Sequence, residues 1–164
     1  MMKLLIVSDT HGQDRNLIRA VNREKPLDKV IHLGDLGKDL PEYIETITDC
    51  PCFMVSGNND WYSPLPSENV IMVGRNRAYI CHGHYYNVSF GTKELERHAR
   101  ALDCDIAMYG HTHYPELKEE GQMTILNPGS LTYPRQPGKL ASYIVATVDD
   151  EGDPTFEVKY LEDL

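Results

Sequence analysis

The chain has 164 residues and a formal net charge of −9, with 41% hydrophobic and 25% charged residues. This composition is typical of a globular protein and excludes a disordered one. The acidic balance argues against a nonspecific nucleic-acid coat, because contacts to phosphates need a basic surface. The apolar run at residues 4–7 is too short for a membrane span or a secretion signal. We expect one domain over residues 1–164, in the cytoplasm, with four reduced cysteines.

The first half of the chain alternates strand and helix patterns. Uninterrupted apolar runs predict strands at residues 3–8, 29–33 and 52–56. Apolar residues at helical spacing predict helices between them, at residues 14–23 and from residue 40 to about 47. This β-α-β-α-β order indicates a parallel sheet with right-handed crossovers.

The second half is richer in strands. Turn residues between apolar runs predict three hairpins, which pair residues 70–73 with 77–81, 116–119 with 123–126, and 142–148 with 155–160. A helix is predicted at residues 92–102 and a strand at residues 106–109. An α/β half joined to a strand-rich half suggests two sheets packed face to face, with helices outside.

Short polar motifs follow five of the predicted strands. In chain order they are Asp9-Thr10-His11, Gly34-Asp35, Gly57-Asn58-Asn59-Asp60, His82-Gly83-His84 and Gly110-His111-Thr112-His113. In open α/β sheets, ligands bind at the carboxyl ends of the strands. We therefore expect these motifs to meet at one edge of the sheets.

Carboxylate and amide oxygens suit Mn²⁺ or Mg²⁺, and imidazoles suit Zn²⁺, Fe²⁺ or Ni²⁺. The motifs offer too many such groups for one ion. A pair of ions that share a carboxylate fits better, and such pairs catalyse in-line displacement at phosphorus. The alternative interpretation is five unrelated polar turns with capping Asp and Asn residues, because each motif alone is common.

Taken in order, the motifs D-x-H, G-D, G-N-x-D, H-G-H and G-H-x-H resemble those of the calcineurin-like metallophosphoesterase superfamily. The short length, the early H-G-H and residues 127–130 (Asn-Pro-Gly-Ser) resemble its small, single-domain YfcE-type phosphodiesterase branch. The retromer subunit of the same fold is also similar. The likeness runs from residue 3 to about residue 135. It implies an α/β protein, a four-layer α/β/β/α sandwich of two mixed sheets with helices outside.

The resemblance also implies the ligands of two divalent ions. One ion would take Asp9, His11 and His113, the other would take Asn58, His82 and His111, and Asp35 would bridge both. Mn²⁺ is the metal expected first, with Ni²⁺, Fe²⁺ or Zn²⁺ as alternatives. Two such ions would let an acidic chain hold an anionic phosphate. Our hypothesis is a bridging hydroxide that attacks the phosphorus of a small phosphodiester in line.

One position departs from the family pattern. Many members carry His after the G-N pair, whereas this chain has Asn59, whose amide cannot act as a general acid. His84 could supply the proton instead, or it could be a packing histidine. The catalytic candidates are thus Asp35, Asn58, Asn59 and His84. Asp60 is expected to orient a neighbouring group or to form a turn.

Aromatic residues follow several of the motifs. They are Trp61, Tyr62, Tyr85, Tyr86, Tyr114 and Tyr133. They could form a rim that stacks on a base or an aryl group, or they could pack under loops as aromatic residues commonly do. Arg135 could contact a phosphate oxygen or could be an ordinary exposed arginine. Of these residues, Trp61, Tyr85 and Arg135 are the candidates for contacts with substrate.

Other polar residues have simpler interpretations. His32 falls inside a predicted strand and is expected to be a hydrogen-bonded core residue. His98 falls on the polar face of a predicted helix and is expected to be solvated. Cys50-Pro51-Cys52 has neither zinc-ribbon nor thioredoxin spacing, which favours ordinary thiols.

The sequence favours a metal-dependent phosphodiesterase, an esterase of phosphoric diesters. A binding scaffold that kept the fold but lost catalysis is the alternative from another class. A phosphomonoesterase or protein phosphatase is a third reading, against which the missing histidine at position 59 counts. A nuclease would need a nucleic-acid surface that the acidic chain lacks. The natural substrate and the oligomeric state stay open, and no membrane partner is expected.

Overall fold

The computed structural model describes residues 1–162. Its strands are β1 (Met2–Val7), β2 (Lys29–His32), β3 (Cys52–Met54), β4 (Glu68–Val73), β5 (Asn76–Cys81), β6 (Ile106–Met108), β7 (Pro115–Glu120), β8 (Met123–Pro128), β9 (Ser142–Val148) and β10 (Pro154–Tyr160). Its helices are α1 (Arg15–Glu24), α2 (Leu40–Thr48) and α3 (Lys93–Ala101), with 3₁₀ turns η1 (His84–Tyr86) and η2 (Val88–Phe90).

The strands form two mixed sheets of five. The first has the order β10-β9-β1-β2-β3, in which β1, β2 and β3 run parallel as predicted. The second has the order β4-β5-β6-β8-β7, in which β5, β6 and β8 run parallel and the two edge strands run antiparallel. The three predicted hairpins are confirmed as the pairs β4–β5, β7–β8 and β9–β10.

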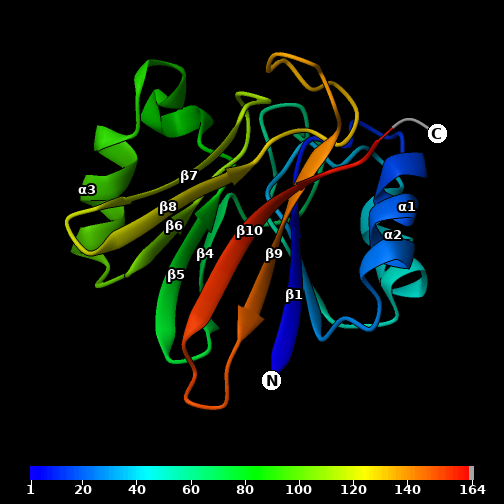
Figure 1. Cartoon of the computed structure of the whole chain (residues 1–164). Coiled ribbons are helices and arrows are strands. Elements are labelled where there is room, and N and C mark those ends of the chain that lie inside the picture. Colours follow the sequence, from blue (N-terminus) through cyan, green and yellow to red (C-terminus); the bar gives the residue numbers. More distant parts are fainter. Residues whose placement is uncertain (163–164) are drawn as a thin grey trace.

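Three apolar cores separate four layers. Alternate side chains of each strand point to opposite faces, so Leu4 and Ile6 of β1 enter the core between the sheets, while Leu5 and Val7 pack against α1 and α2. The third core lies between the second sheet and α3, which contributes Leu95. Figure 1 shows α1 and α2 on one flank and α3 on the other. The predicted four-layer α/β/β/α sandwich is confirmed.

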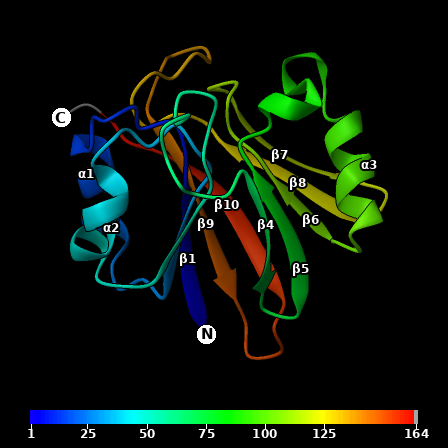
Figure 2. The same ribbon diagram turned by 180° about the vertical axis from the view of Figure 1, so that it is seen from behind.

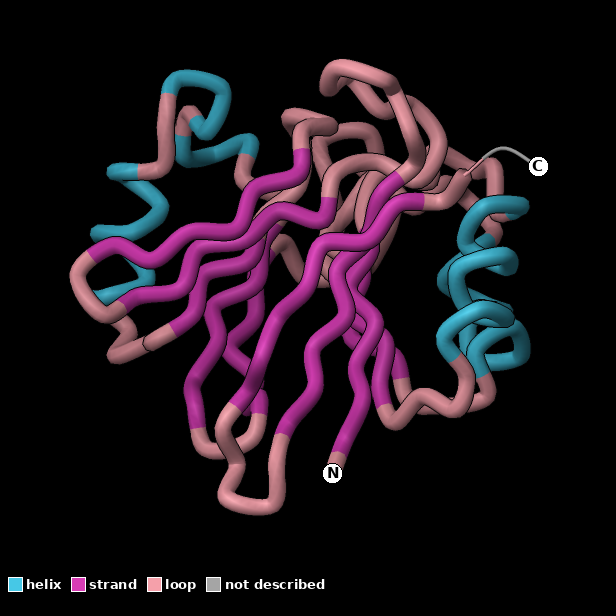
Figure 3. Tube along the Cα trace, in the orientation of Figure 1, coloured by secondary structure: helices cyan, strands magenta, loops and turns pink. Residues whose placement is uncertain are grey.

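Loops gather at one end of both sheets, opposite the N-terminus, as Figure 3 shows. The connection from β3 to β4 crosses there from one sheet to the other, and it can be followed from behind in Figure 2. β3 stops two residues earlier than predicted because the chain turns into this crossing, where the Ser56 amide donates to the Pro66 carbonyl oxygen (2.8 Å). The motifs after β1, β2, β3, β5 and β6 all lie at this loop end.

Two short turns were not expected from the sequence. The turns η1 and η2 follow the H-G-H motif, where Gly83 and Asn87 adopt positive φ angles of 104° and 51° and reverse the chain twice.

Among the described residues, no helix has the length and apolar character needed to cross a membrane.

Candidate metal centre

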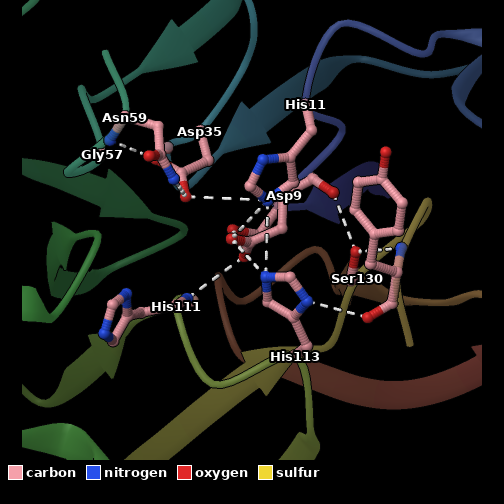
Figure 4. Close-up of polar contacts among 12 residues, drawn as sticks. Asp9, His11, Asp35, Gly57, Asn59, His111, His113 and Ser130 are labelled. Carbon is pink, nitrogen blue, oxygen red and sulfur yellow. Dashed lines mark hydrogen bonds and ion pairs between the residues drawn. The ribbon is translucent and has the colours of Figure 1, made fainter. Parts of the chain in front are cut away.

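The strand-end motifs converge into one cluster (Figure 4). Asp9 Oδ1 lies 3.2 Å from His113 Nε2 and 3.5 Å from His11 Nε2. The two imidazole nitrogens lie 3.4 Å from each other. These three residues come from the loops after β1 and β6, and their ligand atoms are close enough to bind a single metal ion.

A second group shares Asp9 with the first. His82 Nε2 lies 3.4 Å from Asp35 Oδ2 and 3.8 Å from Asp9 Oδ1. Asp35 Oδ2 also lies 3.6 Å from His11 Nε2, so it faces a histidine of each group. Both Asp9 and Asp35 therefore stand between the two groups, and the predicted bridge at Asp35 stays a prediction.

Asn58 and His111 complete the predicted ligand set at its exposed side. Asn58 Oδ1 lies 3.1 Å from His111 Nδ1, and the His111 ring lies 5.1 Å from the ring of His82. Both residues lie next to the second group. His111 is in neither of the two groups that contain Asp9. Their predicted role as ligands of the second ion stays a prediction.

Two buried atoms in this cluster have no hydrogen-bond partner. They are Asp9 Oδ1 and His82 Nε2, on residues that are both 0% exposed. Buried polar groups are nearly always paired, and a buried charge is stable only when it is paired or coordinates a metal. Both atoms face the space shared by the two groups. The residues therefore fit divalent cations.

The carboxylates are held in the charged form that a cation requires. Burial acts to raise the pKa of Asp9, but the neighbouring His11, His113 and His82 outweigh it and hold the pKa well below its usual range. Burial likewise acts to raise the pKa of Asp35, and contacts with His82 and Asn59 lower it to about 2.

Backbone carbonyls orient two of the imidazoles. His82 Nδ1 lies 2.7 Å from the Leu33 carbonyl oxygen, and His113 Nδ1 lies 2.8 Å from that of Tyr133. A carbonyl oxygen can only accept, so each Nδ1 carries the proton. Each Nε2 then presents a lone pair to the cluster, which is the tautomer that binds metals.

Asn59 is directed at Asp35. Its backbone amide donates to Asp35 Oδ1 and its side-chain amide donates to Oδ2, both at 2.9 Å. Asp60 Oδ2 in turn accepts from the backbone amides of Asp35 (2.7 Å) and Gly57 (2.8 Å). This geometry favours a positioning role for Asn59 and places Asp60 where it ties two ligand loops together.

Two glycines leave room for the carboxylates. A Cβ at Gly57 would lie 2.2 Å from Asp35 Oδ1. A Cβ at Gly110 would lie 2.8 Å from Asp9 Oδ2 and 2.1 Å from Ser8 Oγ. Because real Cβ atoms do not approach so closely, the absence of a side chain at both positions sets where the carboxylates can lie.

Five of the predicted ligands have left-handed backbone, which the sequence analysis missed. They are Asp9, His11, Asp35, His111 and His113, with φ between 50° and 72°. This conformation costs about 1–2 kcal/mol for a residue with a Cβ, and such strain gathers at functional sites. Residue type is the one feature of the sequence that could have indicated this backbone, because Asp, Asn and His adopt left-handed angles more readily than most residues.

His84 and the nearby aromatics form one border of the cluster. The His84 ring lies 6.3 Å from that of His111 and 4.1 Å from that of Tyr85, and its buried Nδ1 has no hydrogen-bond partner. Burial, followed by the charges of His82 and His111, lowers the pKa of His84. Tyr85 is 72% exposed.

The remaining candidates lie further from the cluster. Trp61 is 86% exposed beside Tyr62, with ring centres 5.6 Å apart. The Arg135 backbone amide donates to the His113 carbonyl oxygen (3.2 Å), while its exposed side chain lines a hollow beside Tyr114.

The predictions for two histidines outside the motifs compare differently with the structure. His32 is buried and its Nε2 lies 3.0 Å from Thr10 Oγ1, which confirms a hydrogen-bonded core residue. His98 is only partly solvated, as its side chain is 38% exposed. Its ring packs 5.1 Å from those of Tyr79 and Tyr86, because α3 lies against the outer face of the second sheet. The four cysteines are free thiols, as expected.

This chain is similar to proteins named as a probable metallophosphoesterase, a phosphodiesterase and Vps29. It is 28% identical over 166 residues to a probable metallophosphoesterase of Mycoplasma genitalium, covering 99% of this chain and 97% of that one. It is 28% identical over 145 residues to a phosphodiesterase of Methanocaldococcus jannaschii, covering 78% and 83%. Wild-type Vps29 of Entamoeba histolytica, solved in complex with Zn²⁺, superposes with a TM-score of 0.77 at 25% identity, over 97% and 99% of the chains.

A family model extends over nearly all of the chain. Residues 2–151 match the calcineurin-like phosphoesterase superfamily domain. This range contains both residue groups of the metal centre and all five motifs. The chain therefore belongs to the calcineurin-like phosphoesterase superfamily.

Proposed function

We propose that this protein is a metal-dependent phosphodiesterase that hydrolyses small phosphodiesters at a centre of two divalent ions, with Mn²⁺ as the expected metal. The observation that carries the proposal is the pair of buried, unpartnered ligand atoms, Asp9 Oδ1 and His82 Nε2, which face one shared space. The likeness to a phosphodiesterase of M. jannaschii supports diester substrates.

The residues fall into separate roles. Asp9, His11 and His113 would hold one ion, Asn58, His82 and His111 the other, and Asp35 both. When bound, such ions lower the pKa of water and neutralise charge on the phosphoryl oxygens. Asn59 would hold the Asp35 carboxylate in place through its two hydrogen bonds.

His84 is our candidate for the proton donor to the leaving group. Its ring adjoins His111 at the border of the cluster, which would bring it close to a substrate held at the metal ligands. A general acid contributes about 10²–10⁴-fold, and only to leaving groups that need a proton. His84→Ala should slow cleavage of an alkyl diester by about 100-fold and leave bis(p-nitrophenyl) phosphate within about threefold. An equal loss on both substrates would show that His84 has another role.

A scaffold function is the second candidate. The likeness to Vps29 favours it, as does Asn59 at the position where many family members carry His. The presence of a suitable residue at every predicted ligand position favours the enzyme, because missing ligands would favour the scaffold.

The two candidates separate in one assay. The protein is stripped with a chelator, Mn²⁺ is restored, and bis(p-nitrophenyl) phosphate is assayed beside p-nitrophenyl phosphate. We expect cleavage of the diester that requires metal, with the monoester slow. No cleavage of either compound with Mn²⁺, Ni²⁺ or Zn²⁺ would favour the scaffold.

Asp35→Asn provides the matched variant for that assay. The amide keeps the shape of the side chain but removes the charge that faces both groups, so metal-dependent turnover should be lost. Asp150→Asn, at an exposed carboxylate that pairs with the N-terminus, is the control and should retain full activity. Activity retained in Asp35→Asn would contradict the two-ion proposal.

A further inference from the structure

Large aromatic side chains are exposed around the metal centre. Trp61 is 86% exposed, and Tyr62 and Tyr133 are each nearly half exposed. The Tyr133 ring lies 5.3 Å from that of His11. Aromatic side chains usually gain stability by burial, and they are enriched where a protein binds a partner or ligand. Their exposure here excludes the interpretation that Trp61 packs under a loop.

A small cavity joins Tyr62 to the proposed metal ligands. It has a volume of about 140 Å³ and is lined by His11, Asp35, Gly37, Asn59, Asp60 and Tyr62. Asp35 and His11 each belong to one of the two ligand groups, and their side chains lie 3.6 Å apart. A substituent on a phosphate held at those ligands would therefore enter the cavity and meet the Tyr62 ring.

Trp61 lies next to Tyr62, outside the residues that line the cavity. Its ring stands edge-on to Tyr62, with the centres 5.6 Å apart and the planes at 82°. Both residues come from the β3–β4 connection, directly after the motif that supplies Asn58 and Asn59. Asn59 and Asp60 also line the cavity, and both are hydrogen-bonded to Asp35.

We propose that Tyr62, with Trp61 at its edge, forms a stacking surface for a nucleobase, so that the diester is a short nucleotide ester; this rests on the proposed function. A base has a π-face that stacks on an aromatic ring, whereas an alkyl chain has none. A long nucleic acid is disfavoured by the net charge of −9.

Binding can be measured without turnover because Trp61 is the only tryptophan in the sequence. We would titrate the Mn²⁺-loaded protein with adenosine 5′-monophosphate and with ribose 5-phosphate, and follow affinity by calorimetry and location by tryptophan fluorescence. The two compounds share the phosphate and sugar, and only the first has a base. We expect the nucleotide to quench Trp61 and to bind about 5- to 100-fold more tightly.

Three variants separate stacking from other contacts. Tyr62→Ala should remove most of the preference for the nucleotide, and Tyr62→Phe should keep it, because the ring remains. Phe90→Ala, at a 93% exposed ring on η2 that is outside the cavity, should match the wild type. Equal affinity for the two compounds, or the same loss in Tyr62→Phe as in Tyr62→Ala, would overturn the proposal.

The stacking surface and the enzyme can fail independently. Hydrolysis of bis(p-nitrophenyl) phosphate with no preference for the base would overturn the stacking surface alone. Preference for the base without any hydrolysis would overturn the proposed enzyme and leave the stacking surface. If neither compound binds while a protein partner protects Trp61 from quenching by iodide, the two aromatic side chains form a protein-docking surface and the proposal is wrong.

Discussion

Asp9 and Glu24 are both buried carboxylates, and their surroundings are opposite. Glu24 ends α1, where the Tyr143 hydroxyl donates to it at 2.7 Å and the ammonium groups of Lys3 and Lys159 lie at 3.0 and 3.1 Å. Each of its oxygens has a partner of complementary charge or hydrogen-bonding character. This arrangement satisfies a buried charge within the protein itself.

Only one of the two carboxylate oxygens of Asp9 accepts hydrogen bonds. Its Oδ2 accepts from the Ser8 hydroxyl (2.6 Å) and the His111 backbone amide (3.1 Å), while Oδ1 faces imidazoles without a hydrogen bond. Its backbone is also left-handed, with φ of 56°. Glu24 shows that this fold can pair a buried carboxylate fully within the protein when the carboxylate serves only stability. The incomplete satisfaction of Asp9 therefore points to a function, because strain and unpaired charge gather where a ligand binds.

The largest expected effect comes from Asp9→Asn. The loss of a charge shared by both ligand groups should lower metal-dependent turnover by about 10³-fold. Activity of the Mn²⁺-loaded protein measures this effect, and thermal unfolding of the metal-free protein checks that the variant folds. A variant that loses stability and keeps activity would reverse the comparison.

Glu24→Gln should have the opposite profile. The amide cannot pair with Lys3 and Lys159, and losing hydrogen bonds to a charged group costs about 2 kcal/mol of unfolding free energy. Turnover of the folded protein should equal that of the wild type, because Glu24 belongs to neither ligand group. Denaturant unfolding and the diester assay test both halves of this prediction.

The contribution of Glu24 to the free energy of unfolding also depends on pH. Burial acts to raise the pKa of Glu24, but the hydrogen bonds from Tyr143, Lys3 and Lys159 outweigh it and lower the pKa below the ordinary 4.5. The unfolded chain therefore takes up this proton at a higher pH than the folded chain does. The stabilisation is complete above pH 4.5 and disappears as the pH falls through the lower, folded-state pKa.

The pH prediction is tested by unfolding the metal-free wild type and Glu24→Gln at a series of pH values. The difference in unfolding free energy should be constant near neutral pH and should shrink in acid. A difference that widens in acid would show that the folded state raises this pKa.

Asn59→Ala should have a smaller effect on the metal centre. It removes the side-chain hydrogen bond to Asp35 Oδ2 and keeps the backbone one to Oδ1. Groups that orient metal ligands contribute about 10–100-fold to metal affinity, and we expect the lower figure here. Calorimetric titration with Mn²⁺ measures the loss. Ser56→Ala, in the same loop, is the control, and equal affinity in Asn59→Ala would remove the positioning role.

The smallest effect is expected for Arg135→Ala. Its side chain is exposed and lines the hollow beside Tyr114, not the cavity beside Tyr62. Kinetic constants for the diester should stay within about twofold of the wild type, as for most exposed positions. A tenfold rise in KM would restore the proposal that Arg135 contacts a phosphate oxygen.

Strand-end motifs made the centre predictable from the sequence. Apolar runs located the strands that precede the motifs, and the rule that ligands gather at carboxyl ends placed the motifs together. The fold followed from the β-α-β-α-β start and the three hairpins for the same reason, since periodicity reports which faces are buried.

Local geometry was not predictable in the same way. The amide of Asn59 turns back to Asp35, which depends on the loop shape fixed by Asp60, and residue type alone does not reveal it. The left-handed backbone of the ligands arises from turns that no apolar pattern records. His98 packs on two tyrosines that are distant in sequence, so its helix pattern could not show that contact.

The most direct test of the metal centre is anomalous diffraction from a crystal of the protein grown with Mn²⁺. We predict two peaks about 3.5–4 Å apart, as in other two-metal sites, one beside His11 and His113 and the other beside His82. Asp9 and Asp35 should contact these peaks. A crystal with no peak at these residues, or with a single one, would contradict the two-ion centre.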